Sequence, residues 1–351
     1  MKNDFCQLFD QEWSQPPWLI AELSANHNQS LDRALALVDA AANAGAHAVK
    51  VQTFRPEWIT LDSDRPEFLI QNKSSPWFGR RLFDLYSEAA LPLDWHEPIF
   101  KRALKNNILA FSAPFSLEAV DFLESIDCPA YKIASFECVD IPLIKKAAAT
   151  GKPVIISTGM ATAAEIDEAV RAVRDFQTRG PMLLKCTSSY PAPVENSHLA
   201  TLKAMQSAWS APVGLSDHSL SPAPALVATT LGARLIEKHL TLARADGGSD
   251  AAFSLEPAEF TALAQLIKEA HAAIGTVQFG GTTEAERHAR KRRRSLYINQ
   301  DMQAGEIITE KTIRSVRPGY GLPTRYYHEV LGKRVRHNLS KGTPLSWIDI
   351  E

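Results

Sequence analysis

The chain has 351 residues, of which 45% are hydrophobic and 22% charged, and its formal net charge is −2 at pH 7. These values are typical of a globular protein with one large and one small domain, and the charge provides no general attraction to nucleic acid or anionic membranes. No run of the sequence approaches the ~20 apolar residues of a membrane span.

The first part of the chain alternates short apolar runs with helical patterns. Strands are predicted at Trp18–Leu23 and Ala48–Phe54, joined by an Ala- and Leu-rich helix from Leu31 to Ala44 that stops at Gly45. A long excursion from Arg55 to Gly79 follows, and its length indicates either a functional loop or a poorly ordered one. Its four large aromatic side chains suggest an apolar lid or a loop packed on its own barrel. These residues are Trp58, Phe68, Trp77 and Phe78.

The alternation continues with six more strand patterns, each followed by a helical pattern. They are Ile108–Ser112, Tyr131–Ser135, Val154–Thr158, Met182–Ser188, Pro212–Ser216 and Arg234–His239. Short β runs with intervening helices predict parallel βαβ units, and eight of them predict an α/β fold, the (β/α)8 TIM barrel. An open doubly wound sheet is the alternative, but it favours a Gly-rich first turn, which Glu22–His27 is not.

The pattern changes near Gly280–Thr283, where helices give way to short strands and turns. We expect a barrel domain with an N-terminal extension over residues 1–282, a linker at 283–294 and a small, mostly β domain at 295–351. The linker carries a basic cluster from Arg287 to Arg294, which is more typical of a solvated segment than of nucleic-acid binding in a chain with this charge. The four scattered cysteines and the absence of a signal-peptide pattern predict reduced thiols in the cytoplasm.

Two of the strand patterns end in an acid and a histidine, at Asp217-His218 and at Glu237-Lys238-His239. The C-terminal ends of barrel strands carry the active sites of this fold, and imidazole is a favoured ligand of divalent transition metals. His218 and His239 therefore predict a metal-assisted enzyme. The alternative is two ordinary strand-end histidines that hydrogen-bond to the backbone.

Lysines inside apolar strands suggest a second ligand, because a buried ammonium requires an anionic partner. Lys50 and Lys132 occupy such positions. Hydroxyl groups at neighbouring strand ends are suited to phosphate or carboxylate oxygens. The alternative for each lysine is a structural salt bridge or a side chain that extends its ammonium to solvent. Other polar side chains at strand ends are Glu22, Gln52, Ser112, Ser135, Ser157 and Ser188.

Several segments, in the same order, resemble the sialic acid synthase family. They are Ile20–Glu22 with Asn26–Asn28, Ala48–Phe54, Tyr131–Ser135, Gly214–His218, Glu237–His239 and Arg317–Gly321. The resemblance covers nearly the whole chain, including a C-terminal part that is similar to the family's antifreeze-like (SAF) module. It implies a transferase that condenses phosphoenolpyruvate with an amino-sugar aldehyde, using a barrel followed by a SAF domain.

Within that family the sequence motifs are most similar to those of pseudaminic acid synthases, notably at Phe136, Cys186–Pro193 and Asp246–Leu255. The implied sugar is 2,4-diacetamido-2,4,6-trideoxy-β-L-altropyranose, and the implied context is surface glycan biosynthesis. N-acetylneuraminate and legionaminate synthases are alternatives within the family. A metal-dependent pyruvate aldolase and a sugar-acid binding protein are alternatives outside it.

The resemblance also implies roles for individual residues. His218 and His239 would hold Mn²⁺ or Mg²⁺, with Co²⁺ as a further option, and Glu22 would assist proton transfer or orient a water. Catalytic roles fall to Glu22, Lys50, Lys132, His218 and His239. The residues expected to hold phosphoenolpyruvate are Lys50, Ser112, Lys132, Ser135, Ser157, Ser188 and Ser216. Those expected on the sugar side are Gln52, Tyr190, Asp250 and Arg317.

The resemblance implies a domain-swapped homodimer in which Arg317 of one subunit enters the active site of the other. We expect neither nucleic acid nor a membrane as a partner. The sequence leaves the roles of three residues undecided. Asp217 is either a catalyst or a partner of a histidine, and Glu237 either binds the metal through water or pairs with Lys132. His27 lies on a loop at the rim, where it either contacts substrate or does not.

Overall fold

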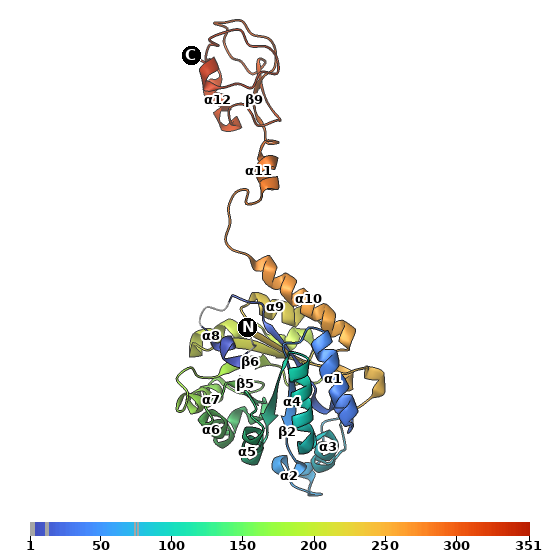
Figure 1. The fold of residues 1–351 in the computed structure, drawn as a ribbon. Coiled ribbons are helices and arrows are strands. Elements are labelled where there is room, and N and C mark those ends of the chain that lie inside the picture. Colours follow the sequence, from blue (N-terminus) through green and yellow to red (C-terminus); the bar gives the residue numbers. More distant parts are fainter. Residues whose placement is uncertain (1–3, 11–13, 74, 76) are drawn as a thin grey trace. The chain divides into compact units, whose positions relative to one another are not determined.

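The computed structural model describes residues 4–10, 14–73, 75 and 77–351, and its central feature is a closed barrel of eight parallel strands within that described part (Figure 1). The strands neighbour one another in chain order, and β1 pairs with β8 to complete the closure. Their bounds are β1 Trp18–Glu22, β2 Ala48–Thr53, β3 Leu109–Pro114, β4 Tyr131–Ile133, β5 Val154–Ser157, β6 Met182–Cys186, β7 Val213–Asp217 and β8 Leu235–His239. The predicted TIM barrel is confirmed.

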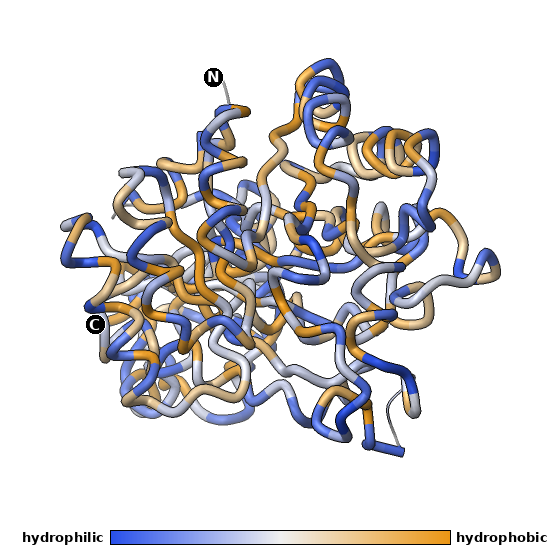
Figure 2. The backbone as a smooth tube through the Cα atoms, turned by 90° about the horizontal axis from the view of Figure 1, so that it is seen from below, coloured by the Kyte–Doolittle hydropathy of each residue, from blue (hydrophilic) through white to orange (hydrophobic). Residues whose placement is uncertain are grey.

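The helices that follow the strands surround the barrel (Figure 1). Figure 2 shows hydrophobic and hydrophilic residues following one another along the chain. This pattern is typical of helices that pack an apolar face on a sheet and expose a polar face to solvent. Local signals fix several ends: Ser30 caps α1, and Thr162 and Glu165 form a capping box at α7. The helices of this unit are α1 Leu31–Asn43, α2 Pro56–Ile59, α3 Leu82–Ala89, α4 His96–Lys105, α5 Leu117–Ser125, α6 Ile141–Ala149, α7 Ala163–Arg174, α8 Thr201–Trp209, α9 Ala223–Thr230 and α10 Pro257–Ile274.

Two strand ends differ from the prediction because other structure begins there. Ser135 was expected on β4, but it precedes a 3-10 helix, η5 (Phe136–Val139), and β4 ends at Ile133. Ser188 was expected on β6, which ends at Cys186. Both serines therefore lie in loops just beyond the strands, at the rim where ligands bind in this fold.

The N-terminal segment fills the opposite end of the barrel. A 3-10 helix, η1 (Phe5–Phe9), buries Phe5 and Leu8 in the barrel core. The Phe5 ring lies 4.7 Å from that of Phe111 and 5.6 Å from that of Trp18, and Arg234 donates a hydrogen bond to the Leu8 carbonyl at 2.9 Å. The barrel is thus packed at the end where its strands begin, and a ligand site must lie at the other end.

The excursion after β2 is held by backbone hydrogen bonds and ion pairs in its described part. Ile70 and Arg80 form a backbone hydrogen bond of 2.9 Å, and Leu69 bridges to Arg81 as in an antiparallel pair. Arg81 also forms ion pairs with Asp62 and Asp64. Residues 74 and 76 of the predicted lid segment lie outside the described residues.

The chain divides into two compact units, residues 1–275 and 276–351. The second contains α11 (Glu284–Arg290), α12 (Tyr327–Val330) and a two-stranded antiparallel sheet of β9 (Ser295–Ile298) and β10 (Ile313–Val316). Isolated bridges extend this pairing around a core that includes Leu296, Ile313 and Val335. The small β-containing domain is confirmed, whereas the boundaries expected at 282 and 294 stay predictions. No helix in the described part of the chain is long and apolar enough to cross a membrane.

Candidate active site

A pocket of about 850 Å³ opens at the C-terminal ends of the barrel strands. It brings together most of the side chains that the sequence singled out. Those lining it are Glu22, Lys50, Gln52, Lys132, Ser135, Ser157, Ser188, Tyr190, Ser216, His218, His239 and Asp250. They come from β1, β2, β4 to β8 and the loops that follow, as the shared rim of parallel strands requires.

Ser112 does not reach this pocket. Its hydroxyl donates to the Val51 carbonyl at 3.0 Å and lies 2.6 Å from the Thr53 hydroxyl, which in turn contacts His96 of α4. Side chains alternate along a strand, and Ser112 is in register with Val51 rather than with the pocket-lining Lys50. It therefore lies between the barrel and α4, on the wrong face for the phosphoenolpyruvate role expected of it.

Lys50 lies at the centre of the polar floor, between two carboxylates. Its ammonium is 3.0 Å from Glu22 and 3.0 Å from Glu237, and all three groups are buried. Burial lowers the pKa of Lys50, but the two carboxylates outweigh this and raise it, so the ammonium stays charged. Glu237 thus pairs with Lys50, where the sequence had left Lys132 or a metal-bound water as its partner.

The two carboxylates differ because the lysines outweigh the effect of burial at Glu237 but only oppose it at Glu22. Burial raises the pKa of Glu22 to about 7, with Lys50 opposing the shift. Burial also raises the pKa of Glu237, but Lys132 and Lys50 together outweigh it and lower that pKa to about 2. One acid that holds a proton near neutral pH beside one that stays ionised is a common arrangement in acid–base catalysis.

Lys132 and three hydroxyl groups form the part of the floor best suited to an anion. Burial lowers the pKa of Lys132, and its ammonium donates to the Ile133 carbonyl at 3.2 Å. The Ser135 and Ser188 hydroxyls are 2.8 Å apart, and the buried Ser157 hydroxyl has no hydrogen-bond partner. Such an unpaired buried group is suited to a ligand oxygen.

Gly159 allows this serine pair to form. Its φ is +45°, and a Cβ there would lie 2.5 Å from the Cβ of Ser135 and 2.8 Å from the hydroxyl of Ser188. No side chain fits in that space, so the glycine lets the loop after β5 approach both serines closely.

The two histidines lie side by side with their ring centroids 5.3 Å apart. Nδ1 of His218 lies 2.9 Å from the Thr187 carbonyl, so it carries the proton and leaves Nε2 as an acceptor. Burial lowers the pKa of His218 to about 4 and that of His239 well below its usual range, so both rings are neutral at pH 7. The buried Nδ1 of His239 has no hydrogen-bond partner.

Neutral imidazoles fit a divalent metal, and the bond from His218 to a carbonyl is the usual way in which proteins orient such a ligand. Among the described residues no cluster of three or more His, Cys, Asp or Glu side chains has the arrangement of a complete metal site. His218 and His239 would supply two imidazole ligands to such an ion.

Two of the four residues predicted on the sugar side, Gln52 and Asp250, form a second group at the β1 edge. Asp250 accepts a hydrogen bond from Ser24, and Gln52 donates to Ser24 at 3.2 Å and to Glu22 at 3.0 Å. Burial raises the pKa of Asp250. The Tyr190 ring lies 4.3 Å from that of His218, which joins this group to the histidine pair.

Asp217 and His27 do not line the pocket. Asp217 pairs with Lys238 at 2.8 Å and accepts from the backbone of Ser219, so it contacts neither substrate space nor a histidine ring. His27 is buried against the Ala89 carbonyl. Of the four predicted lid aromatics, Trp77 lines the pocket and Phe78 is half exposed.

The sequence missed Glu137, Ser189 and Phe253, which also line the pocket. Oε2 of Glu137 is buried without a hydrogen-bond partner, and burial raises its pKa to about 7. Glu137 lies two residues after Ser135 in η5. An acid so close to a strand-end serine was the signal that could have found it.

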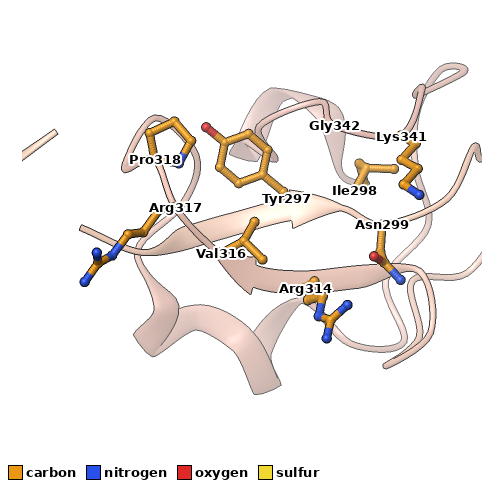
Figure 3. Close-up of a pocket in the computed structure, with 9 residues that line it drawn as sticks. All are labelled: Tyr297, Ile298, Asn299, Arg314, Val316, Arg317, Pro318, Lys341 and Gly342. Atoms are coloured by element: carbon orange, nitrogen blue, oxygen red, sulfur yellow. The ribbon is translucent and has the colours of Figure 1, made fainter. Parts of the chain in front are cut away.

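Arg317 lies in the second unit, after β10, where it borders a separate cavity of about 340 Å³ (Figure 3). Figure 3 shows its side chain extending away from the two strands, while Arg314 and Lys341 lie farther along the sheet. The cavity thus combines three cationic side chains with the Tyr297 ring.

The chain is similar to known protein families over most of its length. Residues 37–279 match the model of the NeuB family, and residues 293–351 match that of the SAF domain. The pseudaminic acid synthase of Helicobacter pylori is 41% identical over 96% of this chain and 98% of that protein. The N,N'-diacetyllegionaminic acid synthase of Campylobacter jejuni is 33% identical over 91% of this chain and 96% of that protein.

A solved structure supports the same relationship. The N-acetylneuraminic acid synthetase of Leptospira borgpetersenii, in complex with citrate, is 32% identical and aligns with a TM-score of 0.68. The alignment covers 78% of this chain and 90% of that one.

Proposed function

The chain belongs to the NeuB family and carries a C-terminal SAF domain, and we propose that it acts as a pseudaminic acid synthase. It condenses phosphoenolpyruvate with 2,4-diacetamido-2,4,6-trideoxy-β-L-altropyranose and water to give pseudaminic acid and phosphate. The observation that carries this is the polar floor of the pocket, where two buried lysines and unpaired hydroxyls lie beside a neutral histidine pair. The higher identity to a pseudaminic than to a legionaminic acid synthase supports the choice of sugar.

Phosphoenolpyruvate is held by its two anionic groups. Lys50 and Lys132 supply the positive charge, and the serine hydroxyls supply donors to carboxylate and phosphate oxygens. The hydroxyls that serve this purpose are those of Ser135, Ser157, Ser188 and Ser216. Fixed charge and orientation are the main contributions of the protein to such a reaction.

Carbon–carbon bond formation joins the methylene carbon of phosphoenolpyruvate to the sugar aldehyde, whose oxygen takes up a proton. Positive charge develops at C2 of the former phosphoenolpyruvate, and the ionised carboxylate of Glu237, which pairs with Lys50, stabilises it. Water then adds to C2 and loses a proton, and the tetrahedral intermediate expels phosphate. Glu22, with its pKa near 7, holds or releases the proton at this end of the pocket.

A divalent ion such as Mn²⁺, Mg²⁺ or Co²⁺ would be held by His218 and His239 and would polarise the aldehyde oxygen. Gln52, Tyr190 and Asp250 bind the sugar beside it. Arg317 of one subunit completes the site of the other in a domain-swapped homodimer. The enzyme works in the cytoplasm, where phosphoenolpyruvate is supplied, on the route to a surface glycan.

The test is an assay of the purified chain with phosphoenolpyruvate, Mn²⁺ and three separate sugars, the precursors of pseudaminate, legionaminate and N-acetylneuraminate. Free phosphate and product mass are measured together. We expect equimolar phosphate and pseudaminic acid, with a kcat/KM that is highest for the first sugar. Product without phosphate would indicate an aldolase, and a higher kcat/KM for another sugar would reassign the substrate.

A further inference from the structure

The pocket has a second chemical character besides its polar floor. One side of it is formed by a set of aliphatic and aromatic side chains that we call the apolar wall. The wall consists of Phe54, Ile59, Ile70, Leu82, Leu85 and Phe115. Phe54 directly follows β2, Ile59 and Ile70 belong to the excursion, Leu82 and Leu85 belong to α3, and Phe115 directly follows β3.

The wall is held in place by the body of the barrel domain. Phe54 is buried, and its ring lies 5.3 Å from that of Phe115 and 6.0 Å from that of Tyr86. Ile70 is fixed by two backbone hydrogen bonds, from its own amide to Arg80 at 2.9 Å and from Gly79 to its carbonyl at 2.8 Å. The excursion is therefore a built side of the pocket that presents apolar groups to whatever the pocket holds.

Strand β2 shows which end of a substrate meets this wall. Lys50, Gln52 and then Phe54 line the pocket at steps of two residues, each step about 6.6 Å towards the mouth. Lys50 belongs to the anion-binding floor, and Gln52 bonds to Glu22 and Ser24 on the sugar side. A sugar whose aldehyde reacts at the floor thus extends its far end, with C6, towards Phe54 and the rest of the wall.

We propose that the apolar wall binds the C6 methyl group of the sugar and makes this enzyme selective for a 6-deoxy sugar over one with a C6 hydroxyl. A methyl group gains from burial against such side chains, whereas a hydroxyl loses its water without finding a partner. The inference rests on the proposed function. An apolar pocket rejects an added hydroxyl by about 10- to 100-fold, so we expect a ratio of kcat/KM in this range.

The experiment compares the trideoxy sugar with its counterpart that differs only by a hydroxyl at C6. In the wall variants Leu82→Asn and Ile70→Thr, polar atoms replace apolar ones at similar size, and both positions are half-buried outside the barrel core. Leu61→Asn is the matched control, because Leu61 belongs to the same excursion, is 66% exposed and does not line the pocket.

We expect each wall variant to lose most of the preference for the 6-deoxy sugar, because its kcat/KM for that sugar falls about tenfold or more. The KM of each wall variant for phosphoenolpyruvate should stay at the wild-type value. The Leu61→Asn control should match the wild type on both sugars. Equal kcat/KM for the two sugars in the wild type would overturn the inference and leave the proposed function standing. So would an equal loss on both sugars in the wall variants. Failure of the wild type to release phosphate with either sugar would instead overturn the proposed function, and the inference with it.

Discussion

At the scale of single residues, the pocket is defined by polar groups that the fold buries without partners. Oε2 of Glu237, Oε2 of Glu137, the Ser157 hydroxyl and Nδ1 of His239 are buried and form no hydrogen bond. Leaving one such group unpaired costs about 1–3 kcal/mol, so a site with several of them is arranged for a ligand at the expense of stability. The same residues should therefore respond strongly to substitution and to pH.

Glu137 should make the stability of the barrel depend on pH. Its pKa is raised from 4.5 to about 7 by burial, so its favourable contribution is present below pH 4.5 and is lost as the pH rises through 7. Glu137→Gln removes this loss. The free energy of unfolding of the variant, relative to wild type, should rise by about 2 kcal/mol between pH 5 and pH 8.

Urea unfolding at the two pH values measures this difference. Glu118→Gln is the control, because Glu118 is exposed on α5 and hydrogen bonds from its own backbone and from Ser116 lower its pKa, in the direction opposite to that of Glu137. A stability difference between the Glu137→Gln variant and wild type that does not change with pH would contradict the account.

The histidine pair should bind metal without contributing to the fold. We expect His218→Ala and His239→Ala each to lower the affinity for Mn²⁺ at least tenfold and to abolish activity, because each removes one of the two imidazoles proposed to hold the ion. Calorimetric titration with Mn²⁺ gives the affinity, and circular dichroism checks the fold. The substitution His198→Ala should leave the Mn²⁺ affinity and the activity unchanged, because His198 does not line the pocket. Wild-type affinity in either pocket variant would refute the assignment.

At the scale of elements, the alternation of strands and helices could be predicted from the sequence. The face of a strand to which each side chain points could be predicted less well. The eight strands and the two lysines were found because apolar runs and buried charges are local signals. Ser112 was misplaced because a one-residue difference in register moves a side chain to the other face of a strand. Glu137 was missed because it lies in η5, a turn of helix that no periodic pattern announces.

The loop after β5 provides a test at this scale. Gly159→Ala would place a Cβ 2.5 Å from that of Ser135, at a φ of +45° that disfavours a side chain. We expect the loop to move, with a rise of at least tenfold in the KM for phosphoenolpyruvate and a modest loss of thermal stability. Gly151→Ala, at φ +77° but with no atom near its Cβ, separates backbone strain from the clash. An unchanged KM in Gly159→Ala would show that the serine pair does not hold this substrate.

At the scale of the whole molecule, the barrel unit carries the pocket and the second unit carries Arg317, which the sequence resemblance assigned to the sugar. The assignment of Arg317 to a site shared between subunits comes from the sequence resemblance. The proposal of a shared site must therefore be tested by function.

Subunit complementation provides that test. Arg317→Ala and Lys132→Ala subunits should each be inactive alone, because one lacks a sugar contact and the other a charge for phosphoenolpyruvate. Mixed, unfolded and refolded together, they should recover roughly a quarter of the wild-type activity, since half of the dimers are mixed and each has one intact site. Refolding each variant alone is the control. No recovery in the mixture would contradict a site completed by the partner subunit.

The most direct measurement on the central claim is the fate of oxygen in the reaction. With phosphoenolpyruvate, the trideoxy sugar and Mn²⁺ in ¹⁸O-labelled water, mass spectrometry follows the label in both products. The account predicts one phosphate per nine-carbon sugar acid, with ¹⁸O in the acid at C2 and none in the phosphate, because water attacks carbon. Labelled phosphate, or a sugar acid formed without phosphate, would contradict it.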